Sequence, residues 1–311
     1  MHYLVTGGAG FIGSIISKKL LFLGNKVTII DNLSTGKKSN IPSKANFIEG
    51  DLSKLKTIKK LNNKKFHAIL HISGQSSGEI SFENPIYDLN SNTTSTLLLL
   101  DYALKTKCNK FIYASSMSVY GEQKGKDRFS ETDKSNPKSF YAVGKLASEN
   151  YLKIYNQQYG INYTILRYFN VYGPGQDLDN LKQGMVSIYL SQFLNNKFKK
   201  VLVKGSKNRF RDFCYIDDAV NITIRSIKDQ RFNNKVINVG TGKKTTVQDV
   251  ILKIKKNLST NKPVIFKGST PGDQHGIYAN VNKIKYLTKF KFTDFNLGLK
   301  KMIQWIKISQ K

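Results

Sequence analysis

The sequence of 311 residues contains little cysteine and little histidine. Its two cysteines, Cys108 and Cys214, are isolated and cannot build a disulfide framework or a CxxC metal site. The four histidines, at positions 2, 67, 71 and 275, lack the spacing of metal ligands, so we expect no metal. No apolar run approaches the roughly 18 residues of a membrane span, and no basic segment with an apolar run precedes the first expected strand. These features predict no membrane association and a location in a reducing cytoplasm.

Acidic residues are also scarce. The chain has 21 Asp and Glu against 50 Lys and Arg, which gives a formal net charge of +29. The lysines are spread along the whole chain and fall on expected helix surfaces and turns, as at Lys18, Lys59 and Lys255. There is no stripe of arginines with interleaved aromatic residues and no recognised nucleic-acid module. We therefore expect no nucleic-acid partner, although the charge can raise the local concentration of an anionic substrate.

A glycine-rich turn lies almost at the start of the chain, in the run Leu4-Val-Thr-Gly-Gly-Ala-Gly-Phe-Ile-Gly13. Gly7 permits a tight turn, Gly10 lets backbone N–H groups approach a pyrophosphate, and Gly13 lets a helix pack closely on a strand. The next strand-like run ends in Asp31, whose carboxylate can accept hydrogen bonds from both ribose hydroxyls and would repel a 2′-phosphate. This pattern predicts a dinucleotide site that selects NAD over NADP.

Strand-like and helix-like stretches alternate over the first half of the chain. The expected strands are 2–5, 26–30, 46–48, 67–72, 110–115 and 162–168, and the clearest expected helices are 11–23, 86–106 and 141–159. Such alternation predicts an α/β fold with a doubly wound parallel sheet of the Rossmann type. Asp51 ends the third strand where it can flank an adenine, but it can equally begin a turn with Ser53 as a helix N-cap.

The regular alternation breaks after Phe169. A loop with Gly and Pro leads to an amphipathic stretch around 184–196 and a strand near 201–203, whereas Val236–Val239 has the pattern of one more strand of the main sheet. We therefore predict an NAD-binding domain over residues 1–168 with a returning segment at about 213–240. Residues 169–212 and 241–311, which end in an amphipathic helix, would form a smaller C-terminal substrate-binding domain.

A tyrosine and a lysine stand four residues apart in Tyr141-Ala-Val-Gly-Lys145, so both lie on one face of the expected helix. A phenol needs a nearby positive field to act as a base, because its unperturbed pKa is about 10. The spacing alone is more often a surface pattern. Here, however, a hydrophobic strand ends upstream in Ser115 and Ser116, at the sheet edge where open α/β folds bind ligands. A hydroxyl there can hydrogen-bond a reacting oxygen and pass a proton toward Tyr141.

The chain resembles the extended short-chain dehydrogenase/reductase family over essentially its whole length, in particular the nucleotide-sugar epimerases and dehydratases. The resemblance is carried by the glycine turn, Ser115-Ser116, Tyr141 with Lys145, and the runs Asp31-Asn-Leu, Asp51-Leu52, Val119-Tyr-Gly121, Leu166-Arg-Tyr-Phe-Asn170, Arg211-Asp-Phe with Asp217-Asp218, Asn238-Val-Gly-Thr-Gly242 and Pro271-Gly-Asp273.

The resemblance implies roles for individual residues. Ser116 would be the catalytic hydroxyl, Tyr141 the base, and Lys145 its modulator and a ribose ligand. Asn170 and Arg211 would hold the diphosphate of the nucleotide sugar, since an arginine fork matches phosphate oxygens. The implied NAD contacts are Gly7, Gly10, Phe11, Ile12, Gly13, Asp31, Asn32, Asp51, Leu52, Gln75, Asn90, Tyr141, Lys145 and Phe169.

The resemblance also favours one reaction. A dehydratase of the family carries an acid pair where this chain has Met117 and Ser118, and a decarboxylase usually has Glu at 118. We therefore expect an NAD-dependent nucleotide-sugar 4-epimerase resembling UDP-glucose 4-epimerase, an isomerase that retains its cofactor. The alternatives left open are a 4-reductase or another sugar-modifying enzyme on the same scaffold, and a non-catalytic NAD-sensing regulator.

Two departures from the family bear on the sugar. Ser76 stands where epimerases often have Lys, and Thr270 stands where an arginine usually precedes Pro-Gly-Asp. By spacing from that motif, Ile277 would border the sugar and favour plain hexoses. Family members usually form homodimers through two helices per subunit, here 86–106 and 141–159, and the apolar run Leu97–Leu100 suits such a helix.

Overall fold

The computed structural model describes residues 1–123, 125–269 and 274–309. Thr270 and the motif Pro271-Gly-Asp273, on which two of the expectations above fall, lie outside these residues. No helix within the described ranges has the length and the apolar character needed to cross a membrane.

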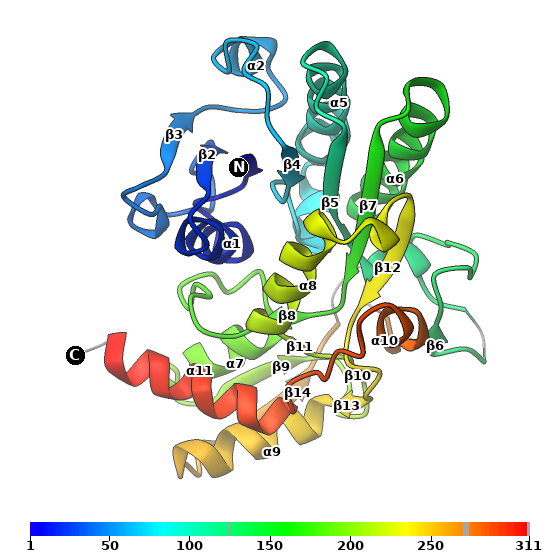
Figure 1. Cartoon of the computed structure of the whole chain (residues 1–311). Coiled ribbons are helices and arrows are strands. Elements are labelled where there is room, and N and C mark those ends of the chain that lie inside the picture. Colours follow the sequence, from blue (N-terminus) through cyan, green and yellow to red (C-terminus); the bar gives the residue numbers. More distant parts are fainter. Residues whose placement is uncertain (124, 270–273, 310–311) are drawn as a thin grey trace.

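The main sheet has seven parallel strands in the order β12-β7-β5-β4-β1-β2-β3. This order, with helices on both sides in Figure 1, is the doubly wound arrangement that the sequence predicts. Each strand expected in the first half of the chain is present. The strands are β1 (His2–Thr6), β2 (Lys26–Asp31), β3 (Asn46–Glu49), β4 (Ala68–His71), β5 (Lys110–Ser116), β7 (Asn162–Tyr168) and β12 (Lys235–Val239).

Central strands of this sheet are apolar on both faces. In β1, Tyr3 and Val5 belong to one hydrophobic cluster, with the helices α1 (Phe11–Phe22) and α8 (Ile216–Lys228). Leu4, between them, belongs to a second cluster, formed with α5 (Ser95–Lys105) and α6 (Phe140–Tyr159). Because successive side chains of a strand point to opposite faces, continuous apolar runs are required for burial on both sides. The two clusters fix α1 and α8 on one face and α5 and α6 on the other.

The expected helix 86–106 is divided into three parts. A short helix α4 (Pro85–Leu89) runs into a π-helical turn η2 (Asn90–Thr94), and α5 follows. In and after this turn, the hydroxyl of Ser95 donates to the carbonyl of Ser91 at 2.6 Å, and that of Thr96 donates to the carbonyl of Asn92 at 2.6 Å. Such side-chain bonds to the preceding turn compete with regular helix geometry, so a polar run interrupts the apolar pattern here.

The remaining strands are two to four residues long. A second sheet has the order β13-β10-β15-β6, and two pairs, β11-β8 and β14-β9, complete the smaller part. Residues 128–129, although within the first half of the chain, join this second sheet through β15. The elements are α2 (Leu55–Lys59), α3 (Gly78–Glu83), β6 (Arg128–Phe129), β8 (Val171–Tyr172), α7 (Met185–Leu194), β9 (Val201–Lys204), β10 (Phe210–Arg211), β11 (Cys214–Tyr215), β13 (Thr245–Thr246), α9 (Val247–Leu258), β14 (Val264–Lys267), β15 (Gly276–Ala279), α10 (Asn282–Thr288) and α11 (Phe295–Ser309), with 3-10 turns η1 (Lys38–Asn40), η3 (Met117–Tyr120) and η4 (Gln230–Phe232).

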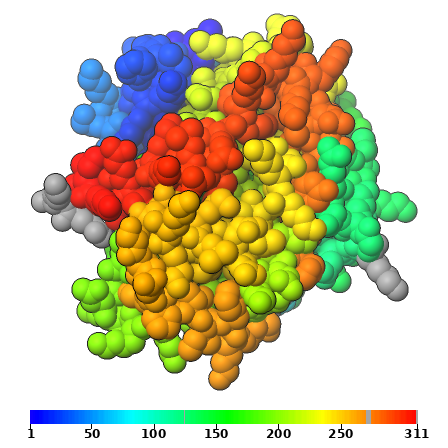
Figure 2. Space-filling view, turned by 90° about the horizontal axis from the view of Figure 1, so that it is seen from below, coloured from blue at the N-terminus to red at the C-terminus, as the bar shows by residue number. Residues whose placement is uncertain are grey.

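This smaller part lies below the main sheet in Figure 1, on the side where the segments that follow β5 and β7 emerge. Seen from below, α9 in gold and α11 in red lie across its surface (Figure 2). The chain passes into it after β7 and returns once to add β12 to the free edge of β7. The carboxyl ends of the parallel strands therefore face the smaller part, where a ligand can be enclosed.

A buried ion pair joins α6 to the main sheet. Arg167 of β7 donates from Nε to Glu149 Oε1 at 2.9 Å and from Nη2 to Oε2 at 2.6 Å, and both side chains are buried. Ser115 donates from its hydroxyl to Glu149 Oε1 at 2.5 Å. The bidentate geometry and the extra donor satisfy a carboxylate that has no access to water. This pair fixes the middle of α6 against the ends of β5 and β7.

Breaking this pair should destabilise the fold strongly. Glu149→Gln leaves the Arg167 guanidinium buried without a counter-charge, which costs about 3–5 kcal/mol. The matched control is Glu83→Gln, which removes a carboxylate from an ion pair with Lys182 in which both side chains are 53% exposed, and it should cost about 0–1 kcal/mol. Urea unfolding of both variants measures the difference in the free energy of unfolding. Equal losses would show that the buried Glu149 pair contributes no more to stability than the exposed pair.

Candidate active site

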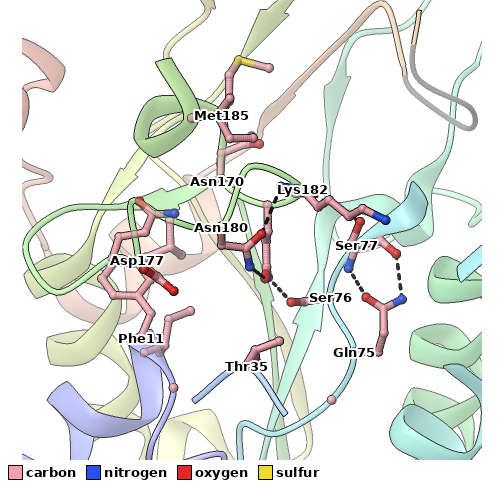
Figure 3. Close-up of a pocket in the computed structure, with 18 of the residues that line it drawn as sticks. Phe11, Thr35, Gln75, Ser76, Ser77, Asn170, Asp177, Asn180, Lys182 and Met185 are labelled. Atoms are coloured by element: carbon pink, nitrogen blue, oxygen red, sulfur yellow. Dashed lines mark hydrogen bonds between the residues drawn. The ribbon is translucent and has the colours of Figure 1, made fainter. Parts of the chain in front are cut away.

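A large cavity of about 1350 Å³ opens at the carboxyl ends of the main-sheet strands. Residues that follow β1, β2, β4, β5 and β7 line it from the main sheet, and the segment 175–189 with parts of β9 and β10 lines it from the smaller part. Figure 3 shows this arrangement, with Phe11 and Thr35 on one side of the cavity and Asn170 and Met185 on another. Fifteen of the predicted site residues line the cavity, namely Gly7, Gly10, Phe11, Ile12, Gly13, Asp31, Asn32, Asp51, Leu52, Gln75, Ser116, Tyr141, Lys145, Asn170 and Arg211.

The glycine turn is shaped by close backbone contacts. Gly7 has a φ of +68°, and a Cβ placed on it would lie 2.8 Å from the backbone of Ser73. A Cβ on Gly13 would lie 2.2 Å from the Gly7 carbonyl oxygen, so helix α1 could not approach the turn with any larger residue there. No side chain caps the start of α1 and no acid stands in its first turn. Its first N–H groups are therefore directed to the cavity, as an anion site requires.

Asp31 ends β2 with its carboxylate held in place. Oδ2 accepts from the Ala9 amide at 3.0 Å, and Oδ1 accepts from the Leu33 amide at 2.8 Å. Each oxygen keeps a second lone pair, so the carboxylate can still accept from a ligand. Asp51 also lines the cavity while it accepts from the Ser53 amide at 2.9 Å, but the N-cap of the following helix α2 is Lys54 rather than Ser53.

Tyr141, Lys145 and Ser116 are brought together at one wall of the cavity. Tyr141 and Lys145 lie one turn apart on α6, and the Lys145 Nζ is 5.8 Å from the centre of the Tyr141 ring. Nζ donates to the carbonyl of Ala114 at 2.9 Å, next to the end of β5. Ser116 is the last residue of β5, and its hydroxyl caps the turn that follows by accepting from the Ser118 amide at 3.2 Å.

Burial acts on the two titratable groups of this trio in opposite directions. It raises the pKa of Tyr141 to about 12, against a lowering by hydrogen bonding to Ser116, and the negative charge of Asp88 raises this pKa further. Burial lowers the pKa of Lys145 to about 8, although Asp88 and Glu149 oppose that change. The residues of the chain alone therefore leave Tyr141 a neutral hydroxyl at neutral pH, and a further positive charge in the cavity is needed to make it a base.

Three predicted site residues do not line the cavity. Phe169 is fully buried in the core. Ile277 is also fully buried, in β15 beside Arg211, so the expectation that its side chain borders a sugar is not met. Asn90 lies at the start of the π-helical turn and accepts from Thr94 instead.

Asn92, two residues further along, is a site candidate that we did not predict. The Asn92 side chain is buried, and a Cβ on Gly74 would lie 2.3 Å from its Oδ1 and 3.2 Å from Lys145 Nζ. Within the described part of the chain, this Oδ1 has no hydrogen-bond donor. Counting back from the buried Leu99 and Leu100 could have identified Asn92.

Asn170 and Arg211 also line the cavity. Asn170 donates from Nδ2 to the Asp212 carbonyl at 3.0 Å. Arg211 is buried and donates from Nη2 to the Gln274 carbonyl at 2.7 Å. Burial, together with the neighbouring Arg209, lowers the pKa of Arg211 to about 10. Two guanidinium groups that face the same cavity favour an anion between them.

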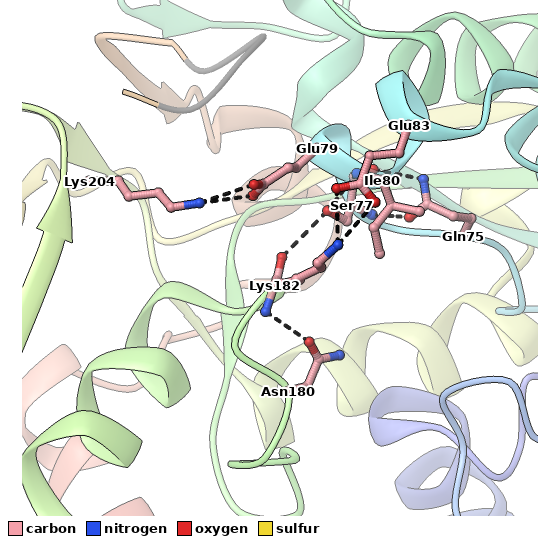
Figure 4. A network of polar contacts seen from close by, with 8 residues as sticks. All are labelled: Gln75, Ser77, Glu79, Ile80, Glu83, Asn180, Lys182 and Lys204. Carbon is pink, nitrogen blue, oxygen red and sulfur yellow. Dashed lines mark hydrogen bonds and ion pairs between the residues drawn. The ribbon is translucent and has the colours of Figure 1, made fainter. Parts of the chain in front are cut away.

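The segment 176–184 crosses the mouth of the cavity and is tied on two sides. Lys37, in the loop after β2, pairs with Asp177 at 2.9 Å and Asp179 at 3.3 Å. On the other side, Lys182 pairs with Glu83 at 3.0 Å, and the Ser77 hydroxyl donates to the Lys182 carbonyl at 3.4 Å (Figure 4). We call this segment the strap.

Ser76 also contacts the strap. Its hydroxyl accepts a close hydrogen bond from the side-chain amide of Gln183. Next to it, Lys204 of β9 pairs with Glu79 at 3.0 Å (Figure 4). The loop after β4 thus contacts the smaller part through neutral and charged groups together.

These observations fit a dinucleotide. The uncapped helix start suits a pyrophosphate, the carboxylate at the end of β2 suits a ribose, and the buried Asn92 oxygen is an acceptor without a donor beside Lys145. NAD can therefore be held between the glycine turn and the trio, with Arg211 and Asn170 left for a second ligand.

Comparison with known proteins agrees with this reading of the site. A protein of Methanocaldococcus jannaschii, named provisionally as a UDP-glucose 4-epimerase, is 36% identical over 305 residues, which is 98% of each chain. The structure of UDP-glucose 4-epimerase from Thermotoga maritima with UDP-glucose superposes with a TM-score of 0.95 at 32% identity, covering 100% of both chains. That of the Thermus thermophilus UDP-glucose 4-epimerase with NAD gives 0.92 at 30% identity, covering 99% of both.

The match extends to a defined family. Residues 3–240, which include the glycine turn, the trio and β12, match the family described as NAD dependent epimerase/dehydratase. With this match and relatives similar over nearly the whole chain, the protein belongs to the NAD-dependent epimerase/dehydratase family.

Proposed function

We propose that the chain is an NAD-dependent nucleotide-sugar 4-epimerase that acts on a UDP-hexose. The observation that carries the proposal is that Ser116, Tyr141 and Lys145 share one cavity with the glycine turn and Asp31. Related proteins named as UDP-sugar 4-epimerases, including a Bacillus cereus UDP-glucuronic acid 4-epimerase at 29% identity, support the reaction class. Residues 1–168 with 213–240 serve the cofactor, and 169–212 with 241–311 serve the substrate.

Each member of the trio has a distinct task. Bound NAD would supply the hydride acceptor and donor for C4 of the sugar. Tyr141 takes the proton of the 4-hydroxyl and gives it back, with Ser116 hydrogen-bonded to the same oxygen. Lys145 keeps a positive charge beside the tyrosine ring and favours its phenolate. No acid stands at Met117 or Ser118 to eliminate water from the sugar, so the 4-keto sugar is retained until it is reduced.

The smaller part holds the nucleotide while the sugar turns. Arg211 and Asn170 bind the diphosphate, which leaves the hexose free to rotate about its link to the phosphate. A cavity of about 1350 Å³ provides the room for this rotation.

Both cysteines, Cys108 and Cys214, are free and buried, which is in keeping with a reducing cytoplasm as the compartment.

The reaction can be tested directly. The purified protein should interconvert UDP-glucose and UDP-galactose with no net consumption of added NAD or NADH, because the cofactor is regenerated in each cycle. Tyr141→Phe keeps the ring but removes the proposed base, so kcat should fall by about 10² or more. A coupled assay over a panel of UDP-, dTDP-, CDP- and GDP-sugars measures both.

Calorimetry with NAD on cofactor-stripped protein provides the control. Tyr141→Phe should bind NAD nearly as well as the parent, which separates lost chemistry from lost binding. Near-normal turnover by the variant would show that Tyr141 is not the base. Steady consumption of reduced cofactor by the parent would indicate a reductase.

The cofactor preference should follow from Asp31. The carboxylate is buried and fixed by the Ala9 and Leu33 amides, so it cannot turn away from a 2′-phosphate. The stripped protein should therefore bind NAD more tightly than NADP, and Asp31→Asn should narrow the difference by removing the repulsion. Isothermal titration calorimetry with both cofactors measures the two affinities. Equal affinities of the parent for NAD and NADP would contradict the role given to Asp31.

We also propose that the chain forms a homodimer through α4, α5 and α6. Large apolar side chains follow one stripe of α6, where Phe140, Val143 and Ile154 are 48%, 51% and 50% exposed. Ile86 and Leu89 of α4 are exposed beside them, at 65% and 49%. An apolar stripe of this extent on a helix whose other face is buried favours a protein partner.

Light scattering at micromolar concentration should give the mass of a dimer. Ile154→Lys places a charge in the middle of the stripe and should shift the mass toward that of a monomer. Leu252→Lys, on α9 at a position of similar exposure, 55%, should leave the dimer intact. A monomeric mass for the parent would count against the dimer.

A further inference from the structure

A buried carboxylate, that of Asp88, lies behind the trio and does not line the cavity. It belongs to α4 and is 1% exposed. Its Oδ1 accepts from Gln75 Nε2 at 2.8 Å and from Asn92 Nδ2 at 3.1 Å. Its Oδ2 lies near the start of α6, since a Cβ on Gly144 would be 3.4 Å from it. Burying a carboxylate this completely costs free energy, so its position suggests a specific role.

The contacts of Asp88 determine which way the Asn92 amide is turned. Asn92 Nδ2 donates to two groups, Asp88 Oδ1 and the Gln75 carbonyl at 3.0 Å. A carboxylate and a backbone carbonyl can only accept, so the NH₂ end of the amide must face them. The Asn92 oxygen then has to point the other way, to the space beside Gly74 where the Lys145 ammonium also lies. Gly74 has no side chain to block this approach.

We infer that Asp88 is a positioning residue of the epimerase reaction, whose carboxylate fixes the orientation of the Asn92 amide and thereby turns the Asn92 carbonyl oxygen toward the Lys145 ammonium. This inference rests on the proposed function. Asp88 touches neither substrate nor cofactor and acts through Asn92 and through its charge. The same carboxylate secures the loop after β4, because it also receives the Gln75 side chain, whose Nε2 donates to the Ser77 carbonyl at 2.7 Å as well.

The charge of Asp88 bears on both titratable members of the trio. It raises the pKa of Lys145 and that of Tyr141, because a nearby negative charge favours the protonated form of each. The other charged or titratable groups that face Lys145 from the elements packed around it are Glu149 of α6, His71 of β4 and Tyr113 of β5. Removal of the Asp88 charge alone therefore lowers both pKa values, and both limbs of a bell-shaped pH profile move to lower pH.

The test is Asp88→Asn, which keeps the shape but adds a donor, so that the Asn92 amide can reverse. We expect kcat to fall roughly tenfold and both limbs of the kcat/KM profile to move to lower pH, with an unfolding temperature near that of the parent. Asp101→Asn is the matched control, since Asp101 is an exposed acid of α5 bonded to the Tyr155 hydroxyl. It should change neither kcat nor the profile. A parent-like kcat and parent-like limbs in Asp88→Asn would overturn the inference.

A double-mutant cycle tests whether Asp88 acts on kcat through Asn92 or independently of it. Asn92→Ala should lower kcat about as much as Asp88→Asn, and the double variant should lose little more, because both changes remove the same oriented oxygen. Losses that multiply in the double variant would show that Asp88 does not act through Asn92. Asp88→Glu, which retains the charge, should lower kcat while keeping the parent limbs, and displaced limbs there would also contradict the proposal. It serves as the second variant if Asp88→Asn does not fold.

The same cycle can be measured without turnover. NAD affinity of the stripped variants, by calorimetry, should weaken several-fold in each single variant and little further in the double, because Lys145 lines the cavity and the Asn92 oxygen lies beside the same glycine as its ammonium. If the protein converts no nucleotide sugar, the proposed function fails while this cycle still decides the Asp88 inference. If it is active and the NAD cycle is additive, the function stands and the inference fails.

Discussion

The structure depends on one helix that carries two buried charges of opposite sign. Along α6, Tyr141, Lys145 and Glu149 follow one another at intervals of one turn, on the flank that faces the sheet. Neither charge can be solvated there, so each has to be compensated by a group from another element. Arg167 of β7 forms an ion pair with Glu149, and the negative charge of Asp88 in α4 compensates that of Lys145 from the other side of the Asn92 amide. The position of the Tyr141 hydroxyl therefore depends on an ion pair with the sheet and on a negative charge from a neighbouring helix.

Much of the main sheet could be predicted because its central strands are buried on both faces. A continuous apolar run such as Tyr3–Val5 is typical of a strand that is covered on both faces. Its place before a glycine turn and a helix indicates the strand-turn-helix order. The trio was predictable in part, since the Tyr141–Lys145 spacing puts both groups on one helix face and the resemblance to the family singled out Ser116 at the end of β5. NAD dependence and the family follow from the same residues, and the comparisons confirm both.

Other features depend on contacts that leave no local pattern. The resemblance pointed to Asn90, whereas Asn92 is the buried asparagine of the π-helical turn, a feature that the expected continuous helix did not include. The short strands of the smaller part are two residues long in several cases, too short for an alternating pattern. Asp212 is an example of what organises them instead. Its carboxylate accepts from the amides of Thr241, Gly242 and Ala279, and so joins three distant segments next to Arg211.

The return of the chain to the main sheet has a consequence for its biosynthesis. Strand β7 has β5 on one side, but its other edge is closed only by β12, which ends at Val239. A ribosome releases residues in order, so the first 168 residues emerge with an open hydrogen-bonding edge and with the core face that α8 will cover still exposed. About 60 further residues must leave the exit tunnel before α8 is complete, and about 70 before β12 can close the open edge. During that interval the nascent chain presents an unpaired apolar strand. Chaperones bind surfaces of this kind, and neighbouring nascent chains can pair through them into non-native assemblies.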